Sequence, residues 1–530
     1  MKPFMKYTAA LLAAAALALP AGIMAVEPVV PALFREVCAD PSLRLDDSDY
    51  TTKTMTVEGR KVVFRAYENL SYVARPVDQT YQTMNIYVPE GYFKGETIHG
   101  YTAETAPIFL PNTVGGYMPG KAGTPVEMER RTGGPNAILA ALDHGYVVAA
   151  PGARGRTNQD EKGRYTGKAP ALIVDMKAAV RYLRHNKGIL PGDTEKMISN
   201  GTSAGGALST LIGATGNAKD YEPYLKELGA AEERDDIYAS SVYCPITDLD
   251  HADMAYEWIF SGVHSYNQRS MPEPSEMGKP GNPPSGEKEN GKLPELPENA
   301  PSAGEVKTLT AKEIRAAGEL KDMYIRYINE QDLRDDKNHS LFLYEDGTGP
   351  FADYIAGLYA ASAQKAIYQG KNLTDIPWLT IHYGRVDGVD LARYAAETGR
   401  LKGTPAFDAF DLSSAENQEF GTAKKDKLHF TSFASKRNTA KKSGMADKKI
   451  IGMMNPLNYI GNKTADTAKY WRIRHGAKDT DTTIAVPALL ALKLKKAGCK
   501  VDFFSPWGVG HAGDYDLEDL FRWIDSICLK

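Results

Sequence analysis

The sequence predicts an α/β fold, built as a mostly parallel central sheet flanked by helices. Short apolar runs of strand length alternate with segments of helical periodicity in the first half of the chain, and the alternation returns near the carboxyl terminus. This pattern is typical of a parallel sheet with helices on both faces. The candidate strands of the first half are residues 55–64, 84–88, 107–110, 146–150, 196–200 and 237–243.

The clearest helix candidate lies between the fourth and fifth of these strands. Its apolar residues are Ile173, Met176, Val180 and Leu183, at spacings of three, four and three residues. Residues with these spacings share one stripe of an α-helix. We therefore expect a helix that packs this stripe against the sheet.

The regular alternation stops after residue 243 and returns at residue 470. Strand patterns at 470–474 and 500–504 and helix patterns at about 484–496 and 517–527 then complete the sheet. Between them, residues 270–304 are so rich in Pro, Gly and Glu that they cannot bury enough apolar surface to order themselves. The predicted organisation is a sheet domain in two parts, residues 26–247 and 466–530. An inserted lid domain at residues 248–465 lies between them and contains the flexible insertion 270–304.

The first 25 residues have the pattern of a cleavable secretory signal. Lys2 and Lys6 precede an apolar run from Ala9 to Leu19, and small residues follow up to Ala25. The apolar run is shorter than the ~20 residues that a membrane-spanning helix needs. We expect an exported protein, secreted or periplasmic, with no membrane anchor after cleavage.

Charge and cysteine spacing exclude several functional classes. The formal net charge of −4 becomes −6 when Lys2 and Lys6 are removed, and no basic block indicates a nucleic-acid partner. The sequence has no C-x-x-C spacing, so the cysteines do not indicate a zinc site. One or two disulfides remain possible in an oxidising compartment. We expect no metal and no cofactor. The cysteines are Cys38, Cys244, Cys499 and Cys528.

Ser203 has the sequence context of a nucleophile. It lies in the run Gly201-Thr-Ser-Ala-Gly205, directly after a candidate strand and before apolar residues at helical spacing. A sharp strand-to-helix turn of this kind presents the Ser hydroxyl at the amino terminus of the helix, and the glycines avoid clashes with neighbouring elements. The alternative is an ordinary Gly-rich turn with a capping Ser. The strand before and the helix after Ser203 favour the nucleophile.

His511 is the candidate general base. It lies in a Gly-rich loop, Trp507-Gly-Val-Gly-His-Ala-Gly513, after the last strand and before the last helix. His475 is the nearest alternative, and we expect it to pack or to form hydrogen bonds locally at the end of its strand. The chain order of nucleophile, acid and histidine favours His511.

Asp479 is the candidate acid. It follows strand 470–474, and the distance of 32 positions from Asp479 to His511 accommodates one helix and one strand. A carboxylate in that position meets the imidazole and fixes its tautomer. Asp387 and Asp390 are alternatives, but they precede His511 by more than 100 residues, and we interpret them as lid or turn residues.

Two backbone positions are candidates for stabilising an oxyanion. One is Ala204, which follows the nucleophile, and the other is the Gly115–Gly116 pair in the loop after strand 107–110. The glycine pair permits close approach of the backbone. A simple turn is the alternative for this loop, and its position favours the oxyanion role.

Several longer segments resemble the bacterial tannases, the tannin acyl hydrolases of the α/β-hydrolase superfamily. The resemblance implies an α/β-hydrolase fold with a large inserted lid domain, and hydrolysis of galloyl esters and depsides of hydrolysable tannins with release of gallic acid. It also implies that Ser203, Asp479 and His511 form the catalytic triad. The segments are Pro111–Gly120, Gly201–Gly206, Lys402 with Pro405–Asp408, Leu412–Asn417, Trp471–Gly476 and Asp479–Asp481.

By the same resemblance, Lys402, Glu416 and Asp481 match galloyl-binding residues. A gallate ring presents three adjacent hydroxyls, which donate to carboxylates and accept from an ammonium group. From charge alone, surface salt bridges are the more common role of such residues. The family match favours binding of small polyphenol gallate esters.

Two other functions remain open. A feruloyl or general carboxylesterase would use the same triad on other esters. A non-catalytic polyphenol-binding protein would bind gallate without hydrolysing it, although an intact set of Ser, Asp and His argues against this class.

Overall fold

The computed structural model describes residues 41–129, 133–267 and 306–529. Residues 40–530 form one compact unit. In the described residues, no helix combines the length and the apolar character that a membrane crossing requires. The predicted signal segment 1–25, the insertion 270–304 and Cys38 lie outside the described residues. The three described cysteines, Cys244, Cys499 and Cys528, are free thiols.

The described residues contain one large sheet of nine strands, in the order β1-β2-β3-β5-β4-β6-β7-β14-β15. Strands β1 to β3 are antiparallel, β3 pairs antiparallel with β5, and the six strands from β5 to β15 are parallel. Together with the flanking helices, this sheet confirms the predicted fold class. Its strands are β1 (Thr51–Val57), β2 (Arg60–Ser71), β3 (Thr83–Pro89), β4 (Pro107–Pro111), β5 (Val147–Pro151), β6 (Asp193–Thr202), β7 (Ala239–Tyr243), β14 (Tyr470–Arg474) and β15 (Lys500–Phe504).

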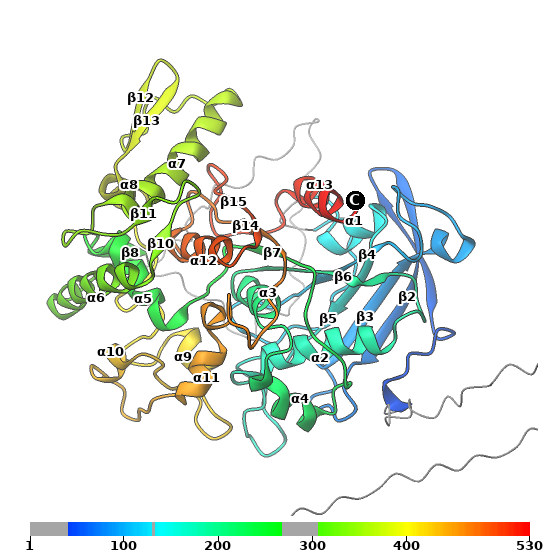
Figure 1. Cartoon of the computed structure of the whole chain (residues 1–530). Helices are drawn as coiled ribbons and strands as arrows, with labels where there is room; N and C mark the ends of the chain where they lie inside the picture. Colours follow the sequence, from blue (N-terminus) through cyan, green and yellow to red (C-terminus); the bar gives the residue numbers. More distant parts are fainter. Residues whose placement is uncertain (1–40, 130–132, 268–305, 530) are drawn as a thin grey trace, which may run out of the picture. The chain divides into compact units, whose positions relative to one another are not determined.

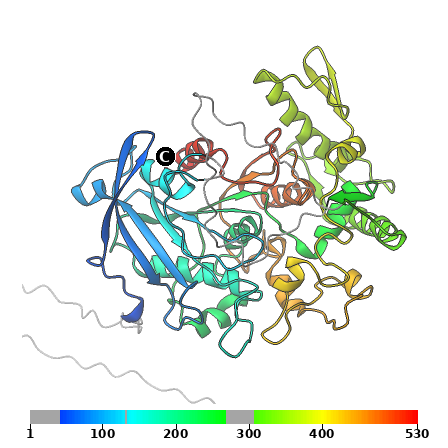
Figure 2. The same cartoon turned by 180° about the vertical axis from the view of Figure 1, so that it is seen from behind.

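Helices cover both faces of this sheet (Figures 1 and 2). Helix α1 packs against α13, and α2 packs against α3, which contacts β6 and β7. The larger helices of the sheet region are α1 (Ala137–Asp143), α2 (Ala171–His185), α3 (Ala204–Ala214), α4 (Glu222–Leu228), α12 (Ala485–Lys496) and α13 (Leu517–Cys528). Helix α2 contains the predicted apolar stripe, and its four residues are buried.

The single strand predicted for residues 55–64 is wrong. The structure has a hairpin there, in which β1 ends at Val57 and β2 begins at Arg60. Glu58 and Gly59 form the turn with φ angles of 49° and 80°. Positive φ values suit the tight turns that join twisted antiparallel strands, and the Gly is the residue that adopts them without strain.

The segment between β7 and β14 builds a second apolar core. Buried side chains of α5, α6 and α7 share this core with residues of α12, which ties the segment to the sheet region. The exact borders of the lid domain stay a prediction. The elements of the segment are α5 (Leu249–Phe260), β8 (Ser265–Asn267), β9 (Val306–Thr308), α6 (Ala311–Glu330), β10 (Leu333–Arg334), β11 (Ser340–Leu341), α7 (Pro350–Tyr368), β12 (Leu379–His382), β13 (Arg385–Val389), α8 (Leu391–Thr398), α9 (Ala415–Glu419), α10 (Ser432–Ser435) and α11 (Lys448–Met453).

Four short 3-10 helices complete the described structure. They are η1 (Pro41–Leu43), η2 (Glu90–Lys94), η3 (Lys219–Tyr221) and η4 (Pro456–Asn458).

Candidate active site

Ser203 occupies the sharp turn between β6 and α3. Its φ of 61° and ψ of −123° lie in a region that non-glycine residues rarely adopt, and its N–H donates to the carbonyl of Tyr243 at 3.0 Å. The flanking glycines are required by space, because a Cβ on Gly201 would lie 2.3 Å from the carbonyl oxygen of Gly205. A Cβ on Gly205 would lie 2.4 Å from Oδ1 of Asn112. The turn therefore stores backbone strain at the residue whose hydroxyl it exposes.

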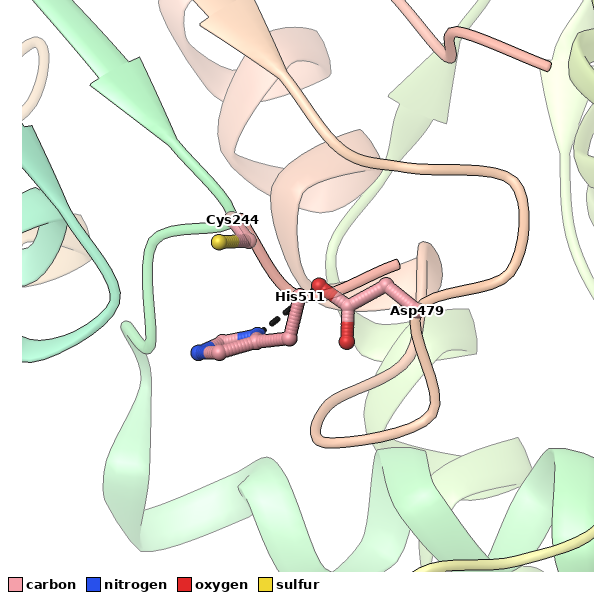
Figure 3. Close-up of side chains that lie close together, drawn as sticks. All are labelled: Cys244, Asp479 and His511. Atoms are coloured by element: carbon pink, nitrogen blue, oxygen red, sulfur yellow. Dashed lines mark hydrogen bonds and ion pairs between the residues drawn. The ribbon is translucent and has the colours of Figure 1, made fainter. Parts of the chain in front are cut away.

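The structure brings Ser203, His511 and Asp479 into hydrogen-bonding contact. Nε2 of His511 lies 2.8 Å from Oγ of Ser203, and Nδ1 lies 2.9 Å from Oδ2 of Asp479. Figure 3 shows the carboxylate of Asp479 against the imidazole ring. The N–H of Asp481 donates to the other oxygen of Asp479 at 2.9 Å, so both carboxylate oxygens have a donor. This is the geometry of a nucleophile, a base and an orienting acid.

The electrostatics of the site favour a negative charge on Asp479 and a positive charge on His511. Burial alone would raise the pKa of Asp479, but the charges of His511 and His475 and the hydrogen bonds hold it at about 2. Burial alone would lower the pKa of His511, but Asp479 reverses this and raises it well above the usual value. Asp479 therefore stays ionised and stabilises the imidazolium that forms when Ser203 gives up its proton.

Of the predicted oxyanion donors, Ala204 directly follows the nucleophile, and the glycine pair lines the cavity that Ser203 faces. Ala204 is the first residue of α3, so its N–H has no partner within the helix. Gly115, Gly116 and Ser203 line the same cavity. Asn112 fixes the start of the glycine loop, since its Nδ2 donates to the carbonyls of Asn200 and Gly205 at 3.1 and 3.0 Å.

Arg156 holds the other end of this loop, and the sequence analysis missed it. Its Nε donates to the carbonyl of Gly116 at 2.8 Å, and its own N–H donates to the carbonyl of Tyr117 at 2.9 Å. Its Nη1 donates to Oε1 of Gln418 on α9. Arg156 thus links the glycine loop to the short helix that carries Glu416. A single Arg after a strand carries no sequence signal for such a role.

Lys402, Glu416 and Asp481 converge on one wall of the cavity. Nζ of Lys402 lies 2.9 Å from Oδ1 of Asp481 and 4.1 Å from the centre of the Phe407 ring. Asp481 also reaches the triad, because its Oδ2 lies 3.8 Å from Nε2 of His511. We call Lys402, Glu416 and Asp481 the carboxylate–lysine cluster.

The charges of this cluster depend on one another. Burial would lower the pKa of Lys402, but the carboxylates of Asp481 and Glu416 reverse this and raise it. Burial raises the pKa of Glu416, and Lys402 opposes part of that rise. Lys402 therefore remains an ammonium group between two acids.

Buried contacts from α5 position Lys402. The hydroxyl of Tyr256 accepts the N–H groups of Leu401 and Lys402 at 2.9 and 3.2 Å. Arg400, the neighbour of this pair, forms a fully buried ion pair with Glu257 at 2.6 Å. Removing one partner of such a pair would leave an uncompensated buried charge. The backbone at Lys402 is therefore rigidly held.

Glu419 adds a buried acid at the end of α9. Its side chain is inaccessible to solvent, and neither carboxylate oxygen has a hydrogen-bond partner among the described residues. Burial raises the pKa of Glu419 to about 8, although Lys168 and Arg156 oppose the rise. Glu419 is therefore protonated at neutral pH.

The alternative residues lie outside the triad. Asp387 lies on β13 in contact with His382 and Arg385, and Asp390 caps α8. His475 was expected to pack or to form local hydrogen bonds; it packs, since it is fully buried, and its ring nitrogens form no hydrogen bond with the described residues. Its Nδ1 instead lies 3.7 Å from Oδ2 of Asp479.

Comparison with known proteins finds close relatives over almost the whole chain. The chain is similar to the tannase of Fusobacterium nucleatum, with 48% sequence identity, a TM-score of 0.84 and coverage of 92% of this chain and 99% of that one. It is similar to the native tannin acyl hydrolase of Lactobacillus plantarum, with 41% identity, a TM-score of 0.82 and the same coverage. A tannin acyl hydrolase in complex with ethyl gallate matches with 41% identity, a TM-score of 0.82 and the same coverage.

A family comparison adds a shorter match. Residues 115–280 match the family model described as BD-FAE. No curated protein matches the chain.

Proposed function

The chain belongs to the tannase family, and from this premise we propose that it hydrolyses galloyl esters through an acyl-enzyme on Ser203. The observation that carries the proposal is the continuous set of contacts from Oγ of Ser203 through His511 to Asp479, beside the carboxylate–lysine cluster. The reaction class is carboxylic ester hydrolysis.

In the first half of the reaction, His511 accepts the proton of Ser203. Oγ then attacks the galloyl carbonyl carbon, and the carbonyl oxygen takes up the negative charge. The N–H groups of Ala204 and of the Gly115–Gly116 pair stabilise that oxyanion. The bond to the alcohol oxygen breaks, and His511 gives its proton to the departing alcohol or phenol.

In the second half, water replaces the alcohol. His511 accepts a proton from the water, which attacks the acyl carbon of the galloyl–Ser203 ester. Collapse of the second tetrahedral intermediate breaks the bond to Oγ, and His511 returns the proton to Ser203. The product is gallic acid. Asp479 keeps Nδ1 of His511 protonated throughout, so that Nε2 remains the atom that accepts and donates.

The carboxylate–lysine cluster recognises the galloyl ring. Phenolic hydroxyls donate to Glu416 and Asp481 and accept from Lys402. A site of this kind rejects analogues that lack the hydroxyls, since its buried polar groups would then lose their partners. The related tannin acyl hydrolase whose complex contains ethyl gallate supports this substrate class.

The size of the cavity supports a large alcohol portion. The cavity has a volume of about 1590 Å³ and extends from Ser203 to residues of α6 such as Glu313 and Arg315. Cavities for drug-sized ligands reach ~1,000 Å³ at their upper end. A galloyl group bound at the cluster therefore leaves space for the polyol of a hydrolysable tannin.

The test is a comparison of kcat/KM on methyl gallate, methyl ferulate and a nitrophenyl acetate. We expect methyl gallate to exceed methyl ferulate by at least about 10²-fold, because ferulate lacks two of the hydroxyl contacts. Equal values would instead indicate a feruloyl or general carboxylesterase. Binding of gallate without release of methanol from methyl gallate would indicate a binding protein.

Export is a separate part of the proposal. The pattern of residues 1–25 supports cleavage after Ala25 and a location in the periplasm or the medium. Mass spectrometry of the mature amino terminus from the native host tests it. A chain that keeps Lys2 and Lys6 would contradict it.

A further inference from the structure

Cys244 places a thiol against the catalytic histidine. It follows β7, adopts a φ of 36°, and donates its N–H to the carbonyl of Arg474 at 2.6 Å. Its side chain is buried, and Sγ lies 3.5 Å from the carbonyl oxygen of Ala512, the neighbour of His511. Figure 3 shows Cys244 and Asp479 approaching the imidazole of His511 from two different loops. The proposed reaction does not use this thiol.

Three potential metal ligands meet here. One ligand atom each from Cys244, Asp479 and His511 lie within 4.8 Å of one another. In a tetrahedral zinc site the ligand atoms lie ~2.0–2.3 Å from the ion. Two ligand atoms of one ion are therefore less than 4.8 Å apart, as these three can be. Because Nδ1 of His511 and Oδ2 of Asp479 lie 2.9 Å apart, an ion bound to both would replace their hydrogen bond and move them slightly apart.

His475, a neighbour of Asp479, gives an independent indication of a ligand. Its imidazole is fully buried, and the described residues supply no hydrogen-bond partner for either ring nitrogen. Such groups are rare, because a polar group that is buried without a partner loses its hydration. Nδ1 of His475 lies 3.7 Å from Oδ2 of Asp479, but His475 is not one of the three ligands that could share an ion.

The donor set selects the ion. One thiolate, one imidazole and one carboxylate are ligands that Zn²⁺ accepts in tetrahedral sites whose fourth position holds water, whereas Mg²⁺ and Ca²⁺ prefer oxygen ligands alone. The only other mixed cluster in the described part of the chain is Asp248, Asp250 and His251, which has no thiol. There Nδ2 of Asn455 already donates to both aspartates, at 2.7 and 2.8 Å.

We propose that Zn²⁺, or another thiophilic divalent cation, binds between Cys244, Asp479 and His511 and reversibly switches the esterase off. The thiol of Cys244 releases its proton to solvent when sulfur binds the ion. Nδ1 of His511 releases its proton to solvent and binds the ion. Nε2 takes up a proton from solvent, so the ring stays neutral. Nε2 becomes a donor and no longer accepts the proton of Ser203. The loss of activity rests on the proposed function, but the binding of zinc does not.

The experiment measures binding and activity separately on the full chain. Calorimetric titration with Zn²⁺ and the visible spectrum with Co²⁺ report binding, and methyl gallate hydrolysis reports activity. We expect one ion per chain, a thiolate-to-cobalt charge-transfer band, and inhibition that EDTA reverses. Cys244→Ser should weaken binding and inhibition about 10- to 100-fold while keeping its activity without metal. Cys499→Ser is the matched control and should behave as the unaltered chain.

Several outcomes would overturn the proposal. They are the absence of saturable Zn²⁺ binding, a cobalt spectrum without a thiolate band, and equal Zn²⁺ inhibition of the chain with and without Cys244→Ser. If Cys244→Ser fails to fold, Cys244→Ala provides the second variant and should weaken Zn²⁺ binding and remove the thiolate band. If methyl gallate is not hydrolysed at all, the proposed function fails, and the binding data still decide the zinc site.

Discussion

The triad and the carboxylate–lysine cluster share one cavity but are built from different parts of the molecule. Ser203, Asp479 and His511 each follow a strand of the large sheet, at the carboxyl ends of β6, β14 and β15. Lys402 and Glu416 come from the segment inserted between β7 and β14, and Asp481 joins them to the triad. The triad is complete without substrate, whereas in the proposed function the charges of the cluster also bind the substrate hydroxyls. In that proposal, the first region determines the reaction and the second determines which ester reacts.

The largest effect is expected from Ser203→Ala. Without the hydroxyl no acyl-enzyme forms, and kcat for methyl gallate should fall by about 10⁶-fold, as for other serine hydrolases. The loss should be equally large for a nitrophenyl acetate. Gallate binding by calorimetry should persist, since the cluster is unchanged. Substantial turnover by this variant would remove Ser203 from the triad.

Asp479→Asn should cost about 10⁴-fold in kcat for both esters. The amide favours the wrong tautomer of His511, so that Nε2 no longer accepts the proton of Ser203. The unfolding transition serves as the control for structural damage. A variant with normal kcat would indicate that another carboxylate, such as Asp481, orients the ring.

Glu416→Gln and Lys402→Met should separate the two regions. Each leaves the triad intact but removes a charged partner of the galloyl hydroxyls, so kcat/KM for methyl gallate should fall by about 10²- to 10³-fold. The value for nitrophenyl acetate should change only a few-fold. Glu313→Gln, on the α6 side of the same cavity, is the matched control. Equal losses on both esters would contradict the division.

Arg156→Lys should give a smaller loss that both esters share. A Lys side chain cannot hold the carbonyl of Gly116 and the amide of Gln418 together, so the oxyanion loop loses its fixed position. We expect a decrease of about tenfold in kcat on both esters, with little change in KM. A change in KM for methyl gallate alone would instead assign Arg156 to substrate binding.

Glu419→Gln should leave activity nearly unchanged and alter the pH dependence of stability. The folded-state pKa of about 8 lies above the usual value of 4.5, so the folded chain binds the proton more tightly than the unfolded chain. Stability from this group is therefore present below about pH 4.5 and is lost as the pH rises through about 8. Denaturant unfolding should show that the free energy of unfolding falls less between pH 5 and pH 9 in the variant than in the unaltered chain. The same decrease in both proteins would contradict the burial argument.

The triad was predictable from sequence and the cluster was not, for a physical reason. A strand, a strained Ser between two glycines and a helix form a local pattern, and Gly201 is required by a contact with Gly205, four residues along the chain. Lys402 is held by Tyr256, 146 residues earlier, and such a contact leaves no local signal. Only the resemblance to a family identified Lys402, Glu416 and Asp481.

The same distinction explains the errors in the sequence-based predictions. The strands and helices of the sheet region were largely predictable from apolar spacing, but residues 55–64, interpreted as one strand, are divided by the turn at Glu58 and Gly59. No sequence pattern identified Arg156, and cysteine spacing bore only on zinc and disulfide sites, so it did not place Cys244 beside His511. Their roles follow from contacts with distant loops, which composition and periodicity do not encode.

Covalent labelling of the nucleophile tests the central claim most directly. A fluorophosphonate probe reacts with an activated serine, and peptide mass spectrometry locates the adduct. We expect one label per chain, on Ser203, with loss of methyl gallate hydrolysis in proportion to labelling and with protection by gallic acid. Label on another residue, or full labelling of Ser203 with esterase activity retained, would contradict the account.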